Sequence, residues 1–176
     1  MPPPSSRARW TSSLPRSCPS RSGPDMAVTT RPATLDDASA IAVLNRDDLG
    51  FFHPVAATRA ALRDALASPR DLVRVAESGG RVVGYVHGEE YRLLYEPPLV
   101  NVMGIAVSGT ARRLGAGAAL MADVEAWACE RGASGLRLVS GETRADAHAF
   151  YQRLGFTGIK KQVNFRKPLP GRGAGR

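Results

Sequence analysis

The chain has 176 residues and a formal net charge of +8, and 43% of its residues are hydrophobic. That length fits one domain with a single sizeable core. No stretch approaches the roughly 18 apolar residues of a membrane span, so we expect no membrane association. The two cysteines, Cys18 and Cys129, form neither a disulfide framework nor a metal-ligand spacing. We therefore expect no metal site, and such sparse cysteine usage is typical of a cytoplasmic protein.

The positive charge is concentrated at the two ends of the chain. Residues 1–25 carry +3 and residues 166–176 carry +4, which leaves +1 for residues 26–165. A near-neutral body lacks the basic stripe that binding to a phosphate backbone requires. We therefore expect no specific nucleic-acid binding. A binder that uses only its basic ends is an alternative, and it would lose that binding when cut to residues 26–168.

The two ends also differ from the body in composition. Residues 1–25 are rich in Ser, Pro and Arg and show no helical or strand period, so we predict a disordered extension. An organelle transit peptide has a similar composition, but the amphipathic pattern of such peptides is missing. A passive tail or a start-site artefact is the simpler interpretation. We predict one domain over residues 26–168, followed by a flexible tail over residues 169–176.

Between these ends the expected elements alternate. Residues 28–31 predict a short strand, and Thr34 caps a helix to about Asn45, with acidic residues in its first turn. The later elements are a helix over 55–67, strands over 72–77, 81–93 and 99–107, a helix from 114 or 115 to 131, a strand over 136–139, a helix over 145–154, and strands over 156–159 and 162–166. This order predicts an α/β domain with a mixed sheet covered by helices.

A glycine-bearing turn follows the apolar strand expected over 99–107. It reads Arg112-Arg113-Leu114-Gly115-Ala116-Gly117 and leads directly into a helix. Unpaired N–H groups and the helix dipole make such a position suitable for a pyrophosphate. The alternative is that the glycines only allow tight helix–sheet packing. The sequence contains neither the three-glycine dinucleotide fingerprint nor a nucleoside-triphosphate loop at this point.

Two motifs in order resemble the GNAT superfamily of N-acetyltransferases. Arg112, Gly115 and Gly117 fill the pattern [Arg/Gln]-x-x-Gly-x-[Gly/Ala] after a buried strand, and the segment from Ala147 to Phe156 matches the second hallmark. The resemblance covers roughly residues 26–168. It implies a mixed, mostly antiparallel sheet with splayed central strands flanked by helices. It also implies an enzyme that moves the acetyl group of acetyl-CoA to a primary amine by direct attack in a ternary complex.

The resemblance further implies where the cofactor lies. The pantetheine arm would occupy the gap between the strands over 99–107 and 136–139, served by main-chain groups of Ile105, Ala106 and Val107. A backbone N–H near Ile105 or Ala106 would stabilise the oxyanion. The pyrophosphate would meet the backbone amides of Arg112, Arg113, Leu114, Gly115, Ala116, Gly117 and Ala118.

Tyr151 matches the family's general acid, which protonates the departing thiolate. A phenol is suited to this role because it stays protonated at pH 7. However, Ala147, Phe150, Tyr151 and Leu154 share one helical face, so a core position for Tyr151 is the alternative.

A base for the amine is harder to find. The position where some relatives carry a glutamate is Asn101, which cannot accept the proton. Glu89 and Glu90, near the end of the strand over 81–93, are the candidates, with solvated surface charges as the alternative. His87 is either a proton relay or a structural histidine.

Acidic residues at Asp47, Asp48, Glu89 and Glu90 predict a cationic acceptor such as a polyamine, an amino sugar or a peptide amine. A loop with Phe51 and Phe52 would form a wall of the acceptor pocket or fill the core. A non-catalytic acyl-CoA sensor or partner subunit is the alternative function, and it needs no Tyr151. Relatives are often dimers, so a homodimer is an open alternative.

Overall fold

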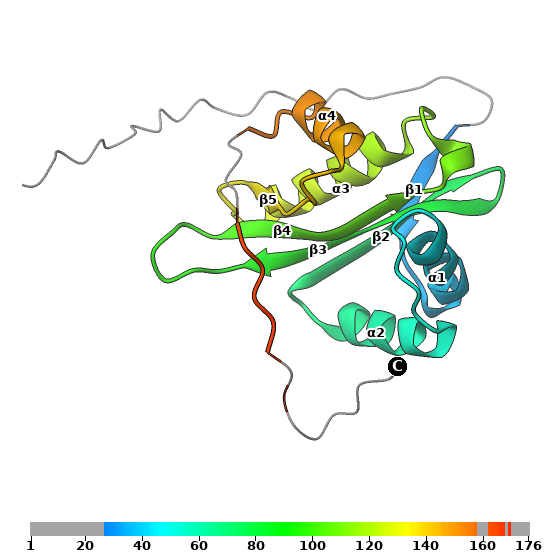
Figure 1. Ribbon diagram of the computed structural model, residues 1–176, viewed down its shortest axis with the longest axis horizontal. Coiled ribbons are helices and arrows are strands. Elements are labelled where there is room, and N and C mark those ends of the chain that lie inside the picture. The colour runs from blue at the N-terminus through cyan, green and yellow to red at the C-terminus, as the bar shows by residue number, and fades with distance from the viewer. Residues whose placement is uncertain (1–26, 158–161, 168, 170–176) are drawn as a thin grey trace, which may run out of the picture.

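A computed structural model describes residues 27–157, 162–167 and 169 (Figure 1). The predicted N-terminal extension and all but one residue of the predicted C-terminal tail lie outside these residues. The described part forms one open sheet with two layers of helices.

Five strands make up the sheet, and their order in space follows their order in the chain. They are β1 (Thr29–Pro32), β2 (Asp71–Ser78), β3 (Arg81–Tyr91), β4 (Leu99–Val107) and β5 (Leu136–Leu138). The first four pair antiparallel, and β5 pairs parallel with β4. The prediction of a mixed, mostly antiparallel sheet is therefore confirmed.

The helices lie on the two faces of this sheet (Figure 1). They are α1 (Ala38–Asp47), α2 (Val55–Ala67), α3 (Ala116–Glu130) and α4 (Ala145–Arg153), with short 3-10 turns over Leu35–Asp37 and Gly109–Ala111. Helices α1 and α2 cover one face, where Ile41, Leu44 and Val75 form a core. Helix α3 covers the other face with Leu120 and Val124, both fully buried as the helical period predicts.

A salt-bridge network joins the start of the first helical layer to the sheet. Arg31 of β1 donates to Asp37 with both terminal nitrogens, at 2.7 Å each, and also to Glu77 of β2. Asp37 is buried and also accepts from the backbone N–H of Thr34 at 2.7 Å. The hydrogen bonds from Arg31 hold the pKa of the Asp37 carboxyl below its usual range.

The sheet opens between β4 and β5. Their parallel pairing covers only three positions and stops at Val102 and Leu138. At the same point the register between β3 and β4 shifts, because Gly88 opposes Val102, His87 opposes Gly104, and Met103 has no partner. Such a bulge bends the strand and increases its twist. The remainder of β4, from Met103 to Val107, therefore has no neighbour on the β5 side among the described residues.

One predicted element is wrong. The described residues over 162–167 form no strand, although the alternation in Gln162–Arg166 favoured one. Val163 and Phe165 are 77% and 89% exposed, so the apolar positions of that pattern find no surface to bury them. Phe156 and Thr157 are also not in a strand, and the rest of that predicted element lies outside the described residues. Strand β3 ends at Tyr91, two residues before the predicted end.

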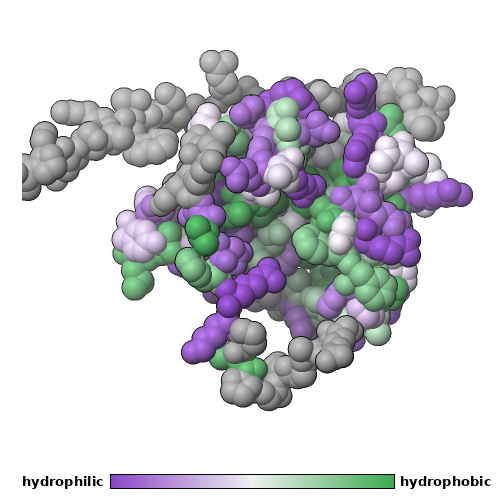
Figure 2. Space-filling model, viewed as in Figure 1, coloured by the Kyte–Doolittle hydropathy of each residue, from purple (hydrophilic) through white to green (hydrophobic). Residues whose placement is uncertain are grey.

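Hydrophilic side chains dominate the top of the molecule over α4, and hydrophobic ones surround its recessed middle (Figure 2). Among the described residues, no helix is long and apolar enough to cross a membrane.

The Asp37 network predicts a specific acid response. The folded state favours the ionised carboxyl, so its stabilisation is fully present above the unfolded pKa of about 3.9 and is lost as the pH falls through the lower folded pKa. We expect Asp37→Asn to lower the free energy of unfolding by about 1–3 kcal/mol at pH 7. The variant should also lose less stability than the wild type between pH 4 and pH 2, on the order of 1 kcal/mol less.

Urea denaturation at pH 7 and at acidic pH measures both effects. Asp36→Asn is the matched control, because that neighbouring side chain is 93% exposed. Equal behaviour of the two variants would contradict the role given to Asp37.

Candidate active site

The turn before α3 has the backbone geometry of an anion-binding loop. Arg113 has a positive φ of 67° and Gly115, the N-cap of α3, has a φ of 84°. Only glycine adopts a φ near 84° without strain, which explains why position 115 is a glycine. The N–H groups of Ala116, Gly117 and Ala118 begin the helix and have no intrahelical partner. Unpaired N–H groups at a helix N-terminus, such as these three, fit a diphosphate.

Close packing also explains why position 117 is a glycine. A Cβ at this position would lie 3.0 Å from Cζ of Phe150, which is closer than real Cβ contacts normally are. Gly117 therefore lets α4 pack directly against the first turn of α3. The sequence left open that a glycine here serves close packing, and a Cβ at position 117 would meet Phe150 of α4 and, at 3.7 Å, Val107 of the sheet.

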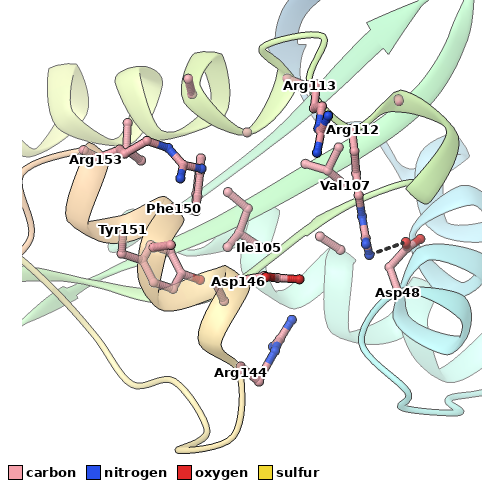
Figure 3. Close-up of a pocket in the computed structure, with 18 of the residues that line it drawn as sticks. Asp48, Ile105, Val107, Arg112, Arg113, Arg144, Asp146, Phe150, Tyr151 and Arg153 are labelled. Carbon is pink, nitrogen blue, oxygen red and sulfur yellow. Dashed lines mark ion pairs between the residues drawn. The ribbon is translucent and has the colours of Figure 1, made fainter.

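A cavity of about 1060 Å³ lies between the end of β4, the first turn of α3 and helix α4 (Figure 3). We call it the large cavity. Of the ten predicted cofactor residues, all but Leu114 line it: Ile105, Ala106, Val107, Arg112, Arg113, Gly115, Ala116, Gly117 and Ala118. Leu114 is 42% exposed and is not among the lining residues.

The open edge of β4 determines which main-chain groups face this cavity. The N–H of Ser108 donates to the carbonyl of Val83 in β3 at 2.8 Å. Because backbone groups alternate between the two edges of a strand, those of Ile105 and Val107 point to the opposite edge, where β5 has diverged. Those of Ala106 point toward β3. Of the two candidates for an oxyanion donor, the geometry favours Ile105.

A second cavity of about 360 Å³, the small cavity, adjoins the first. Phe51, Met103 and Gly104 line it, together with residues that follow β5. The two cavities share Asp48, Leu49, Ile105, Arg144 and Tyr151. Of the predicted pocket aromatics, Phe51 lines the small cavity, while Phe52 is 78% exposed and lines neither.

Tyr151 lies where the cavities meet, and Figure 3 shows its ring directed into this space. Helix α4 ends at a left-handed Gly155, and the N–H of Phe156 bonds back to the carbonyl of Tyr151 at 3.1 Å. This ending packs Phe156 against Tyr151, with ring centroids 5.8 Å apart. Burial raises the pKa of the Tyr151 hydroxyl above 10, although the charge of Arg144 opposes the shift. The phenol is therefore half-buried, oriented and protonated at neutral pH.

Neither predicted base lines either cavity. Glu90 is buried and pairs with Arg92 at 2.8 Å and with Arg131, just after α3, at 3.5 Å. Glu89 lies next to it on the other face of β3, opposite Asn101. His87 forms a 2.7 Å contact with Asp71, which favours the structural interpretation of this histidine.

Asp48 is the one residue of the four acids expected to attract a cationic acceptor that lines the cavities. It follows α1 and lines both cavities, and its carboxylate lies 3.6 Å from the guanidinium of Arg112 (Figure 3). Its neighbour Asp47 is half exposed and pairs with Arg46 instead. Helical spacing alone does not separate these two adjacent acids, because both lie at the end of α1.

Comparison with known proteins identifies the family. The model of the acetyltransferase (GNAT) family matches residues 39–156, which contain the turn, both cavities and Tyr151. The chain belongs to the GNAT acetyltransferase family. GNAT enzymes use acetyl-CoA, so this protein is an N-acetyltransferase with acetyl-CoA as its acetyl donor.

Similar proteins include an aminoglycoside N(6')-acetyltransferase type 1 of Serratia marcescens, 31% identical over 118 residues that cover 63% of this chain and 80% of the relative. Among solved structures, the aminoglycoside N-acetyltransferase AAC(6')-Iy in complex with CoA has a TM-score of 0.72 at 19% identity, over 81% of this chain and 95% of that one. A transcriptional regulator from Bacillus halodurans C-125 has a TM-score of 0.71 at 25% identity, over 80% and 99%. The two structural matches support the fold.

The contact between Gly117 and Phe150 can be tested by a double-mutant cycle. We expect Gly117→Ala to lower stability by about 1–3 kcal/mol, because the new methyl group collides with the Phe150 ring. Phe150→Leu removes the ring atoms that would collide. The double variant should therefore be more stable than the sum of the single changes predicts, measured by urea denaturation. Strict additivity would show that the two residues do not touch.

Proposed function

We propose that this enzyme acetylates a primary amine of a small polycationic acceptor of the aminoglycoside class. One observation carries the proposal: two cavities, one beside the turn before α3 and one beside Met103 and Gly104, meet at Asp48, Ile105 and Tyr151. A donor in the large cavity and an acceptor in the small cavity would place the thioester and the amine at the same point. This arrangement favours direct attack over a covalent enzyme intermediate.

The donor half fits coenzyme A by its polar groups. The open N–H groups at the start of α3, with Arg112 and Arg113, would hold the diphosphate. The unpaired edge of β4 would hold the pantetheine arm as an added strand, through Ile105 and Val107.

The chain's own groups supply two steps of the reaction. The backbone N–H of Ile105 would donate to the acetyl oxygen as negative charge develops there. Tyr151 would give its proton to the departing sulfur as the new carbon–nitrogen bond forms and the carbon–sulfur bond breaks. The amine must lose a proton as well. Because Glu89 and Glu90 do not line the cavities, we propose that water carries this proton to solvent and that a proton from solvent restores the Tyr151 hydroxyl.

The acceptor class rests on charge and on similarity. Asp48 is the one carboxylate that lines both cavities within the described part of the chain, and a carboxylate there favours a cationic acceptor. The curated relative at 31% identity is named an aminoglycoside acetyltransferase, which matches the amino sugar among our expected acceptors. Cytoplasmic location, a homodimer and the lack of nucleic-acid binding remain predictions. The sensor alternative predicts cofactor binding without turnover.

Tyr151→Phe tests the general acid. We expect kcat to fall about 10²-fold or more, with coenzyme A affinity unchanged, because only the proton donor is lost. Since burial raises the pKa of Tyr151, the wild type should keep this step to a higher pH than a solvent-exposed phenol would. Tyr95→Phe is the matched control, as that ring is 79% exposed. Equal kcat values for Tyr151→Phe and the wild type would reject the role.

Release of coenzyme A with a panel of amines tests the acceptor. The panel contains neamine, an otherwise similar aminoglycoside with a hydroxyl in place of the 6'-amine, spermidine and a lysine peptide. We expect the highest kcat/KM with neamine and a loss of at least about 10²-fold without the 6'-amine, because the reacting nitrogen is then missing. A preference for the peptide would contradict the acceptor class, and no turnover with any amine would favour the sensor.

A further inference from the structure

An ion pair stands at the junction of the two cavities. Nη2 of Arg112 lies 3.6 Å from Oδ1 of Asp48, and Figure 3 shows the two side chains reaching toward each other across the opening. Asp48 lines both cavities, whereas Arg112 lines only the large one. The Asp48 side chain is 12% exposed and that of Arg112 is 64% exposed. The pair therefore joins a nearly buried carboxylate to an exposed guanidinium group.

The acid is held in place by the end of α1. The N–H of Asp48 donates to the carbonyl of Leu44 at 3.0 Å. One turn earlier, Asn45 accepts a 2.5 Å hydrogen bond from the buried Tyr85 of β3, which ties α1 to the sheet. Arg112, in contrast, is a long side chain on an exposed turn. The backbone that carries Asp48 is therefore anchored, whereas the Arg112 side chain has room to rearrange.

Asp48 depends on a nearby cation. A carboxylate that is removed from water is destabilised unless a positive charge or hydrogen-bond donors compensate for it. Within the described residues, the structure gives the Asp48 carboxylate one charged partner, Arg112. At 3.6 Å this contact is an ion pair and lies beyond hydrogen-bond distance, so it is a partner that another anion can draw away.

The diphosphate of the donor is such an anion. Arg112 is the first residue of the turn that fits the diphosphate, and a guanidinium binds phosphate strongly. When Arg112 turns to the diphosphate, Asp48 remains nearly buried at the mouth of the small cavity without its cation. An ammonium group that enters the small cavity can replace that cation.

We propose that Asp48 binds an ammonium group of the acceptor, and that Arg112 occupies this subsite until the donor is bound. This inference rests on the acetyl transfer to a polycationic amine proposed above. It predicts that the enzyme binds donor and acceptor cooperatively, with the donor favoured first. Because coupling between two sites is reciprocal, the acceptor must also tighten the binding of the donor.

Titration calorimetry with coenzyme A and neamine measures the coupling without turnover. For the wild type we expect neamine to bind about tenfold more tightly when coenzyme A is saturating, which is within the usual range for coupled sites. In Asp48→Asn, neamine should bind weakly both with and without coenzyme A. In Arg112→Gln, neamine should bind free enzyme as tightly as it binds the wild-type complex with coenzyme A.

The affinity of Asp48→Asn for coenzyme A separates this inference from a merely structural ion pair. If Asp48 competes with the diphosphate for Arg112, the variant binds coenzyme A as tightly as the wild type or up to a few-fold more tightly. If Asp48 only orders the turn, the variant binds it more weakly, which would overturn the inference. Asp47→Asn is the matched control, because this acid lines neither cavity and pairs with Arg46, and it should keep the tenfold coupling.

The two proposals fail in different ways. Tight neamine binding by Asp48→Asn, or coupling of less than about twofold in the wild type, would overturn the role of Asp48 while acetyl transfer to neamine stands. Absence of neamine binding and turnover in every form would overturn the acceptor class, and this inference with it.

Discussion

The site depends on one interruption in the sheet. Strands β4 and β5 pair over only three positions, and a bulge at Met103 marks the point where they part. A continuous sheet would satisfy the backbone of Ile105 and Val107 with a neighbouring strand. Because β5 diverges, these groups face a cavity, and that cavity can accept an extended ligand that pairs like a strand. The positions that we propose for the donor and for the acceptor both follow from this gap.

Helix α4 closes the gap from outside, and small residues decide how closely it approaches. Gly117 has no side chain at the point where the Phe150 ring contacts α3. Next along α4, Tyr151 is held between Phe150 and Phe156, with ring centroids at 5.4 and 5.8 Å. The same packing that partly buries Phe150 therefore holds Tyr151 at the junction of the cavities. The core and catalytic interpretations of this helix face are compatible. Phe150 packs against the core, and we propose the catalytic role for Tyr151.

Charge at the junction is divided between two elements far apart in the chain. Asp48 comes from the end of α1 and Arg112 from the turn before α3. The pair gives the Asp48 carboxylate a counterion within the chain, and the proposed exchange of partners would link the binding of an anionic donor to that of a cationic acceptor. Glu90 of β3 and Asp71 of β2 serve the scaffold instead. Glu90 pairs with Arg131 just after α3, and Asp71 of β2 contacts His87.

The candidate acid came from the resemblance to the GNAT superfamily, whereas the sequence by itself determined the order of the elements from β1 to α4 and a turn suited to an anion. These are local properties: helical and strand periods, a glycine at a left-handed position, and a helix N-terminus after a buried strand. It misplaced a strand over Gln162–Arg166, because alternation cannot show whether a partner strand is present. It also left Asp47, Asp48, Glu89 and Glu90 equivalent. Only the tertiary structure brings Asp48 to Arg112 and keeps both glutamates out of the cavities, because such contacts join residues distant in the chain and depend on how helices pack on the sheet.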